Sequence, residues 1–173
     1  MNRDSSWITT LSQPGRRSTV RGVLWLLLLF LLTQQVRPVA VAVVAGPPQT
    51  VVTRAPRLGV HTRLIDEVEP WKIQRSLALV RVMGAPWVVE LFPWAYHQPA
   101  PDRFAWRQAD LIIDHAEAQG LTVIARISLT PDWARPADTT LNYLDADGYA
   151  AYAVFAAAFA ARYRGRVAHI VIG

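Results

Sequence analysis

The 173-residue sequence contains no cysteine, which excludes a disulfide framework and a thiolate metal site. Charged residues make up only 18% of it, less than the usual share of roughly one quarter, whereas hydrophobic residues make up 52%. This composition is typical of a globular protein with a sizeable buried core, and the length is that of about one domain.

Acidic residues are almost absent from the N-terminal segment. Asp4 is the only acid before Ala55, in a stretch that contains six arginines, whereas 12 acidic residues balance 12 basic ones from Ala55 onward. The net charge of +5 therefore belongs to the N-terminal segment. Because the remainder is neutral, we expect no nucleic-acid partner.

The same segment has the pattern of an export signal. A cluster of arginines precedes the apolar run 23–32, which is about the length of a signal-peptide core and shorter than the roughly 20 residues of a spanning helix. Ala40 and Ala42 then form an A-x-A pattern suited to signal peptidase. We expect residues 1–42 to be a cleaved signal peptide. The alternative is an anchor that contacts the membrane through residues 22–44, and both place the rest outside the cytoplasm, secreted or anchored.

A linker and a folded part follow. Residues 46–56 are rich in proline and lack a helical period, so we expect a linker over 43–56 and a folded domain over 57–173. In that domain, Ile73, Leu77 and Val80 have the spacing of an amphipathic helix, and continuous apolar runs are typical of buried parallel strands. We expect strands at 58–61, 87–92, 121–127 and 167–172, and helices at 70–83, 106–119 and 148–163.

The order β-α-β-α-β-α-β predicts right-handed crossovers and a parallel sheet. Asp145 or Asp147 is suited to cap the last helix. The helix-to-strand connections are minimal, whereas the strand-to-helix connections are long and carry aromatic residues, which is typical of a (β/α)8 barrel. The alternative is a doubly wound nucleotide fold, which usually has a glycine-rich turn after its first strand, and residues 61–66 contain no glycine.

Four strands cannot close an eight-stranded barrel, because the fourth would be an edge with unpaired backbone groups. We therefore expect an α/β fold that is the N-terminal half of a TIM (β/α)8 barrel, preceded by a hydrophobic leader and truncated at its fourth strand. The missing C-terminal half-barrel is then a partner, supplied by a longer chain or by assembly. Without it, the chain would be a nonfunctional fragment with apolar surface exposed to water.

One stretch resembles a known group of enzymes. Pro99, Phe104, Trp106 and Asp110 form the pattern P-x-x-x-x-F-x-W-x-x-x-D, which is followed by a helix and by the G-L-x-V-I of the third strand. The T-P-D-W-A at 130–134 looks like the third strand-to-helix loop of the same enzymes. In order and spacing, the chain resembles the clan of retaining glycoside hydrolases with a (β/α)8 barrel, closest to its family 39 xylosidase-like and family 5 cellulase-like members.

The resemblance implies hydrolysis of O-glycosyl bonds in a β-linked poly- or oligosaccharide. The mechanism uses two glutamates about 5–5.5 Å apart, an acid/base at the end of strand four and a nucleophile at the end of strand seven. The first would stand just after Gly173, and neither lies in this sequence. We therefore expect no catalytic residue in this chain, which would be inactive alone. The alternative is a non-catalytic carbohydrate-binding barrel fragment on the cell surface.

Six side chains near the expected strand ends are candidates for binding the substrate. They are His61, Glu90, Trp94, Tyr96, Arg126 and Trp133. Aromatic rings stack against the C–H faces of sugars, and loops at this end of a barrel carry function. The alternatives are a structural role for His61, a buried ion pair between Glu90 and Arg126, and simple loop packing for the aromatic rings.

Other residues are expected to be structural. The histidines show neither HxH nor HExxH spacing, so we expect no metal and no cofactor. Asp110 and Asp114 are expected on a solvated or capping face of their helix. The expected core aromatic residues are Trp71, Trp106, Tyr152, Phe155, Phe159 and Tyr163.

Overall fold

The computed structural model describes residues 16–35 and 44–173, which belong to two separate units. The N-terminal unit contains the helix α1 (Arg16–Gln35), whose apolar side chains over 23–32 are exposed. Within these described residues, no helix combines the length and the apolar character needed to cross a membrane. The expected cleavage motif at 40–42 lies outside the described residues.

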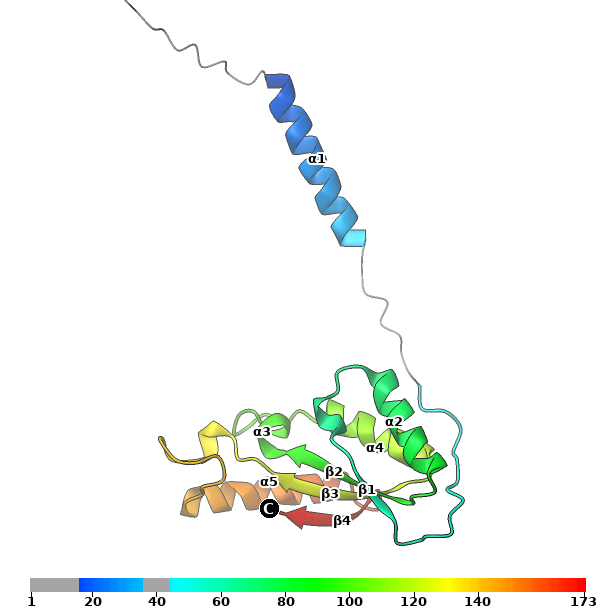
Figure 1. Ribbon diagram of the computed structural model, residues 1–173. Coiled ribbons are helices and arrows are strands. Elements are labelled where there is room, and N and C mark those ends of the chain that lie inside the picture. The colour runs from blue at the N-terminus through cyan, green and yellow to red at the C-terminus, as the bar shows by residue number, and fades with distance from the viewer. Residues whose placement is uncertain (1–15, 36–43) are drawn as a thin grey trace, which may run out of the picture. The chain divides into compact units, whose positions relative to one another are not determined.

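The second unit is built around one parallel sheet. Its strands lie side by side in chain order (Figure 1): β1 (Gly59–His61), β2 (Trp87–Pro93), β3 (Thr122–Ser128) and β4 (Val167–Ile172). All three neighbouring pairs are parallel. The predicted strands and their parallel order are therefore confirmed, and the arrangement is that of successive strands in a TIM barrel.

Three long helices connect the strands. They are α2 (Pro70–Val82), α4 (Arg107–Ala118) and α5 (Ala146–Arg162). Asp145 caps α5 as predicted, because its Oδ1 accepts a hydrogen bond from the amide of Gly148 at 2.8 Å. Three short elements lie in the strand-to-helix connections, where the sequence indicated only loops: η1 (Leu64–Asp66), α3 (Trp94–His97) and η2 (Asp132–Ala134).

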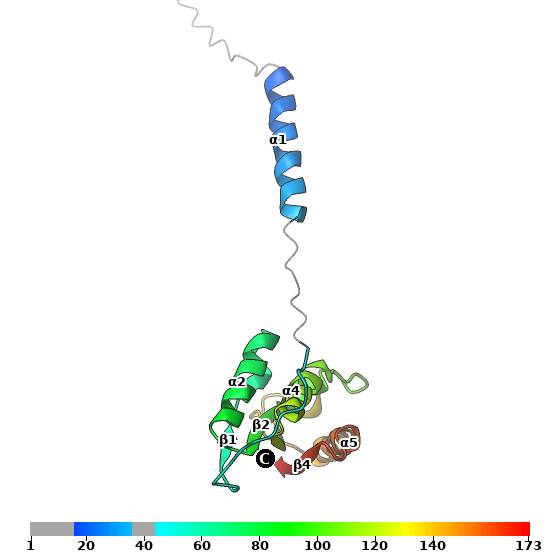
Figure 2. The same ribbon diagram turned by 90° about the vertical axis from the view of Figure 1, so that its right-hand side faces the viewer.

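The two faces of the sheet have different surroundings. Val88, Phe92, Val123 and Ile127 are buried in the core on the face that the helices cover. Figure 2 shows α2, α4 and α5 arranged around this side of the sheet. On the opposite face, side chains such as Arg126 are exposed. We call this second face the open face; in a closed barrel it lines the interior.

Aromatic residues of α5 and of its C-cap position form part of the core beside the sheet. Phe155, Phe159 and Tyr163 are at most 1% exposed, which confirms their predicted place. The ring of Trp106 packs against them, with ring centroids 6.1 Å from those of Phe159 and Tyr163. Tyr152 is half-buried, and its hydroxyl donates to the carbonyl of Ile127 at 2.8 Å, so α5 is attached directly to β3.

The prediction that Trp71 lies in the core is wrong. Its side chain is 47% exposed, and Lys72 Nζ lies 5.6 Å from the centre of its ring. The buried residues of α2 are Ile73, Leu77 and Val80. Trp71 stands two residues before Ile73, which is about 200° around a helix of 3.6 residues per turn, so it points away from the core.

Arginines join the outer surfaces of α4 and α5. Arg162 binds Asp110 at 2.6 Å, and the hydroxyl of Tyr163 donates to the same carboxylate at 2.9 Å. Burial opposes ionisation of Asp110, but these hydrogen bonds outweigh it and hold the pKa of its carboxyl below the usual value. Arg166 binds Asp114 at 2.6 Å in the same way. The two aspartates, expected on a solvated or capping face, therefore join α4 to the end of α5 and to the turn that follows it.

The proline-rich segment packs against the folded unit. Residues 47–56, which we call the strap, contain no helix or strand. Nevertheless, the amide of Gln49 donates to the carbonyl of Ala118 at 2.8 Å, and Val51 packs against the core. Carbonyl oxygens of the strap also approach Gly84 and Gly120, the residues at which the chain leaves α2 and α4. In the structure, the strap is thus part of the folded unit.

Replacing Gly120 by alanine is expected to destabilise this unit by more than about 2 kcal/mol. Gly120 has φ = +67°, which costs a residue with a Cβ roughly 1–2 kcal/mol, and an added Cβ would also collide with the carbonyl oxygen of Gln49. Gly165→Ala is the matched control, because Gly165 has φ = +78° but no neighbour within 4 Å. Equal losses of stability in chemical denaturation would contradict close packing of the strap.

Candidate functional site

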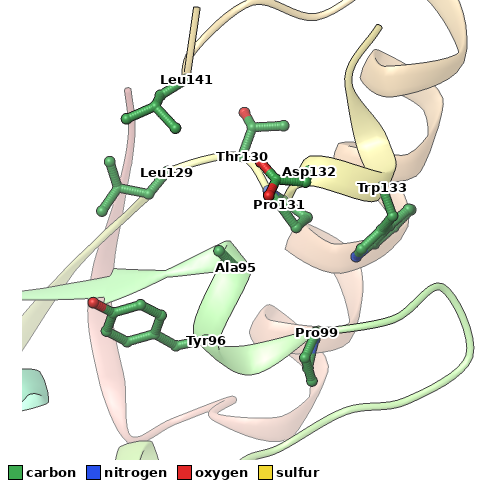
Figure 3. A pocket seen from close by; sticks show the side chains of 9 residues that line it. All are labelled: Ala95, Tyr96, Pro99, Leu129, Thr130, Pro131, Asp132, Trp133 and Leu141. Atoms are coloured by element: carbon green, nitrogen blue, oxygen red, sulfur yellow. The ribbon is translucent and has the colours of Figure 1, made fainter. Parts of the chain in front are cut away.

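A cavity of about 500 Å³ lies where β2 and β3 end. Its walls are the helix α3, which follows β2, and the connection that follows β3. Figure 3 shows the nine residues that line it: Ala95, Tyr96, Pro99, Leu129, Thr130, Pro131, Asp132, Trp133 and Leu141. This is the end of the strands at which α/β barrels carry their sites.

Two aromatic rings flank this cavity. Tyr96 comes from α3 and is 52% exposed, whereas Trp133 comes from η2 and is half-buried (Figure 3). The indole Nε1 of Trp133 donates to the carbonyl of Gln98 at 2.9 Å, which holds the ring in one orientation. Prolines and leucines supply most of the remaining lining. The cavity therefore offers apolar surfaces with polar edges, which suits a ring that has both C–H faces and hydroxyls.

Asp132 is the one carboxylate among the nine lining residues. Its side chain is 86% exposed and forms an ion pair with Arg135 at 2.6 Å. Arg135 also donates to the carbonyl of Thr139 at 2.5 Å, which ties the first turn of the connection to its middle. A carboxylate has about four acceptor positions, so Asp132 retains capacity to accept from ligand hydroxyls.

The two walls of the cavity are joined through Leu129. The carbonyl of Leu129 accepts a hydrogen bond from the amide of Ala95 at 3.0 Å. Leu129 has φ = +62°, a left-handed conformation that is uncommon for a branched side chain. Such strain is found where the surrounding structure fixes a functional segment. The cavity is therefore lined by a backbone held in an unfavourable conformation.

The position of Trp94 corrects one prediction. Its ring is 0% exposed and packs behind Trp133, with centroids 5.4 Å apart at 81°. Tyr152 and Phe155 contact it from α5, and its Nε1 donates to Gln98 Oε1 at 2.7 Å. Because Trp94 begins a helical turn, its side chain is directed into the core. The prediction that Trp94 lines the cleft is therefore wrong, and the packing alternative holds.

Glu90 is also fully buried, at 0% exposure, on the face of the sheet that the helices cover. Its Oε1 accepts from the amides of Leu64 and Ile65 at 2.8 and 3.1 Å, and its Oε2 accepts from Thr62 Oγ1 at 2.5 Å. Burial raises the pKa of Glu90, and these hydrogen bonds oppose the rise. Glu90 thus holds the connection that follows β1 and, at 0% exposure, is not accessible to a substrate, which corrects its assignment as a candidate for binding.

The predicted ion pair between Glu90 and Arg126 is absent. Glu90 pairs in register with Ala125, whereas Arg126 pairs with Leu91. Because successive side chains of a strand alternate between faces, Arg126 lies on the opposite face from Glu90. His61 pairs with Val89 and is likewise exposed on the open face.

Of the six predicted site residues, the structure brings only Tyr96 and Trp133 together in this cavity. Leu129, Asp132 and Leu141 also line the cavity and were not predicted from the sequence. The sequence did contain an indication of Asp132, because this residue belongs to the T-P-D-W-A motif. It contained no indication of Leu141, because the position of Leu141 beside the cavity depends on the path of a long connection. In residues 16–35 and 44–173, no group of three His, Cys, Asp or Glu side chains could hold a metal ion.

No family model matches the sequence, and no curated protein matches it. Solved structures with a similar fold do exist. A family 39 glycoside hydrolase from the gut symbiont Bacteroides cellulosilyticus WH2 has a TM-score of 0.56 and 14% identity over 67% of this chain. A GH5_18 protein from Streptomyces cattleya in complex with Manβ1-4GlcNAc has a TM-score of 0.56 and 21% identity over 66%. A β-galactosidase from the psychrophilic Marinomonas ef1 has a TM-score of 0.56 and 19% identity over 66%.

These similarities show the fold. The structural neighbours are clan A glycoside hydrolases with a TIM barrel, and the four strands and interleaved helices of this chain match part of that barrel. The chain spans 24%, 33% and 21% of the lengths of the three proteins named above.

Proposed function

We propose that this chain forms the sugar-binding surface of half of a (β/α)8 glycoside hydrolase that cleaves β-linked poly- or oligosaccharides. The observation that carries the proposal is the cavity at the carboxyl ends of β2 and β3, with Tyr96 and Trp133 on its walls. A sugar ring stacks on such side chains through its C–H face while its hydroxyls bond Asp132 and backbone groups. The Streptomyces neighbour, which binds Manβ1-4GlcNAc, supports a carbohydrate ligand.

In this proposal, the chain binds sugar but does not hydrolyse it. The retaining mechanism requires two carboxyl groups about 5–5.5 Å apart. Asp132 is the one carboxylate that lines the cavity, and Glu90 is buried on the face that the helices cover. We therefore assign both catalytic glutamates to the remainder of the barrel, with the acid/base directly after Gly173.

Trp133→Ala tests the proposal. The full chain is titrated with a panel of β-linked disaccharides that includes Manβ1-4GlcNAc. We expect the variant to bind about 10-fold more weakly, or by about 1.4 kcal/mol, because the stacking surface is lost. Trp71→Ala is the control, since Trp71 is 47% exposed on α2 and does not line the cavity.

Unchanged affinity in Trp133→Ala, or an equal loss of affinity in both variants, would contradict the assignment of this cavity to sugar binding. A turnover assay on the same samples separates binding from hydrolysis. We expect no release of product from the chain alone, and measurable release would contradict the assignment of the two glutamates to the remainder of the barrel.

We also propose that this surface works outside the cytoplasm. The support is the order of the N-terminal segment, in which arginines precede the apolar run 23–32 and an A-x-A pattern follows at 40–42. N-terminal sequencing of the protein recovered from the culture medium should give Val43 as the first residue. Retention of the whole protein in the cytoplasm would contradict export.

A further inference from the structure

One residue accepts hydrogen bonds from two tryptophans beside the cavity. The main-chain carbonyl of Gln98 accepts from Nε1 of Trp133 at 2.9 Å, and its side-chain Oε1 accepts from Nε1 of Trp94 at 2.7 Å. Trp133 flanks the cavity, and Trp94 packs edge-on behind it, with ring centroids 5.4 Å apart. The orientation of both rings therefore depends on Gln98.

The direction of the Gln98 carbonyl is not set by a helix or a strand. Gln98 follows the last residue of α3, and its backbone, with φ = −138° and ψ = 74°, is neither helical nor extended. Its amide N–H donates to the carbonyl of Trp94 at 2.8 Å, and its side-chain Nε2 donates to the carbonyl of Pro101 at 2.7 Å. These bonds hold Gln98 against the residues before and after it, and so direct its carbonyl at Trp133.

The two side-chain bonds of Gln98 require an amide. An indole N–H only donates and a carbonyl only accepts, so the side chain must present one acceptor to Trp94 and one donor to Pro101 at the same time. Gln98 is 2% exposed, so water does not replace either bond. A side chain of equal length without these groups leaves a buried donor and a buried acceptor unpaired. We expect residue 98 to lose its fixed position in that case.

Gln98 also lies where the two walls of the cavity are joined. Tyr96 lies two residues before it and Pro99 directly follows it, and both line the cavity with Trp133, whereas Gln98 does not. The bond between Gln98 and Trp133 connects residues 35 positions apart, one in the connection after β2 and the other in the connection after β3. A shift of Gln98 therefore changes the position of one aromatic ring relative to the other.

We propose that Gln98 is a positioning residue for sugar binding. It does not contact the sugar, but it holds the ring of Trp133 at its place beside the cavity (Figure 3) before the sugar binds. A stacking side chain that is already ordered strengthens binding, because the entropy cost of ordering it does not arise on association. The inference rests on the proposed function, since the sugar is assigned to this cavity.

The test is a double-mutant cycle on the full chain, titrated with the panel of β-linked disaccharides that includes Manβ1-4GlcNAc. Gln98→Met keeps the length of the side chain and removes both of its hydrogen-bonding groups. We expect it to weaken binding by about 3- to 5-fold, less than the loss in Trp133→Ala. In the Trp133→Ala chain, the same substitution should leave the affinity unchanged, because Gln98 acts through that ring.

A second measurement needs no sugar. The ¹H–¹⁵N signal of the Trp133 indole reports whether its bond to Gln98 is kept, and we expect Gln98→Met to shift it. Gln119→Met is the matched control. Gln119 is 8% exposed and accepts from Arg81 Nε at 2.8 Å through its side chain, but it does not line the cavity. Gln119→Met should lower stability and leave both the affinity and the indole signal unchanged. If Gln98→Met does not fold, Gln98→Glu, which keeps the shape and the acceptor for Trp94, replaces it in the cycle.

Affinity that is the same in Gln98→Met and in the original chain would overturn the inference, as would an equal loss of affinity in the Trp133→Ala chain or in Gln119→Met. An indole signal of Trp133 that does not move in Gln98→Met would overturn it as well. Failure of the proposed function is distinguishable, because it would appear as disaccharide binding that Trp133→Ala does not change. If Trp133→Ala weakens binding and Gln98→Met does not, only the role of Gln98 has been assigned wrongly.

Discussion

Replacing Glu90 by alanine is expected to lower the free energy of unfolding by about 3–5 kcal/mol, because it leaves buried hydrogen-bond donors without an acceptor. The carboxylate accepts from Thr62 Oγ1 and from the amides of Leu64 and Ile65. All of these donors lie in the connection after β1, whose other hydrogen bonds to β2 are those from Thr62 to the carbonyl of Val89. The connection is therefore expected to loosen before the rest of the unit unfolds.

Two controls isolate this effect. Glu90→Gln keeps the shape and one acceptor oxygen, so its loss should be smaller than that of Glu90→Ala. Glu69→Ala removes an exposed carboxylate that is paired with Lys72, and surface pairs contribute about 0–1 kcal/mol. Urea denaturation followed by tryptophan fluorescence measures all three. If Glu90→Ala and Glu69→Ala lost the same stability, the buried carboxylate would have no special structural role.

Trp94→Ala is expected to cost about 3–5 kcal/mol of stability, the range for truncating a fully buried aromatic residue. Trp94 contacts Trp133, Tyr152 and Phe155, with ring centroids 5.2 to 5.7 Å apart, and so joins both connections to α5. Trp94→Phe keeps most of this packing and loses only the hydrogen bond to Gln98, so it should be much less damaging.

The comparison of Trp94→Ala with Trp133→Ala separates packing from binding. Trp94→Ala should lower the unfolding midpoint strongly, whereas Trp133→Ala should lower sugar affinity with a smaller effect on stability. Calorimetry and ligand titration on the same samples measure the two quantities. Normal stability in Trp94→Ala would show that its ring does not hold the connections together.

The architecture could be predicted because it depends on local patterns. Apolar runs, helical spacing and the cap at Asp145 all act over a few residues, and each predicted strand and helix of the folded unit lies within one or two residues of its expected bounds. The long strand-to-helix connections also indicated the end of the sheet at which Tyr96 and Trp133 meet. These features required no knowledge of how neighbouring strands align.

The predictions for individual side chains were wrong where the alignment of neighbouring strands or a local turn determines the direction of the side chain. Glu90 and Arg126 are both near strand ends, but their strands align so that Glu90 is beside Ala125. A shift of one residue places a side chain on the other face of a sheet, and register cannot be deduced from one strand. Trp94 was placed in a loop, whereas the turn of α3 carries its ring into the core. Trp71 is exposed because its position around the helix α2 directs its side chain away from the core.

The strap determines how far the N-terminal segment can be removed without destabilising the folded unit. Secondary structure alone suggests that everything before Arg57 is dispensable, since the first strand begins at Gly59. Such trimming would discard the hydrogen bond of Gln49 and the packing of Val51, and would uncover the carboxyl ends of α2 and α4. Leader processing after Ala42 would retain all of these contacts. Cleavage after Ala42 would then lie only a few residues before the first residue of the smallest stable domain.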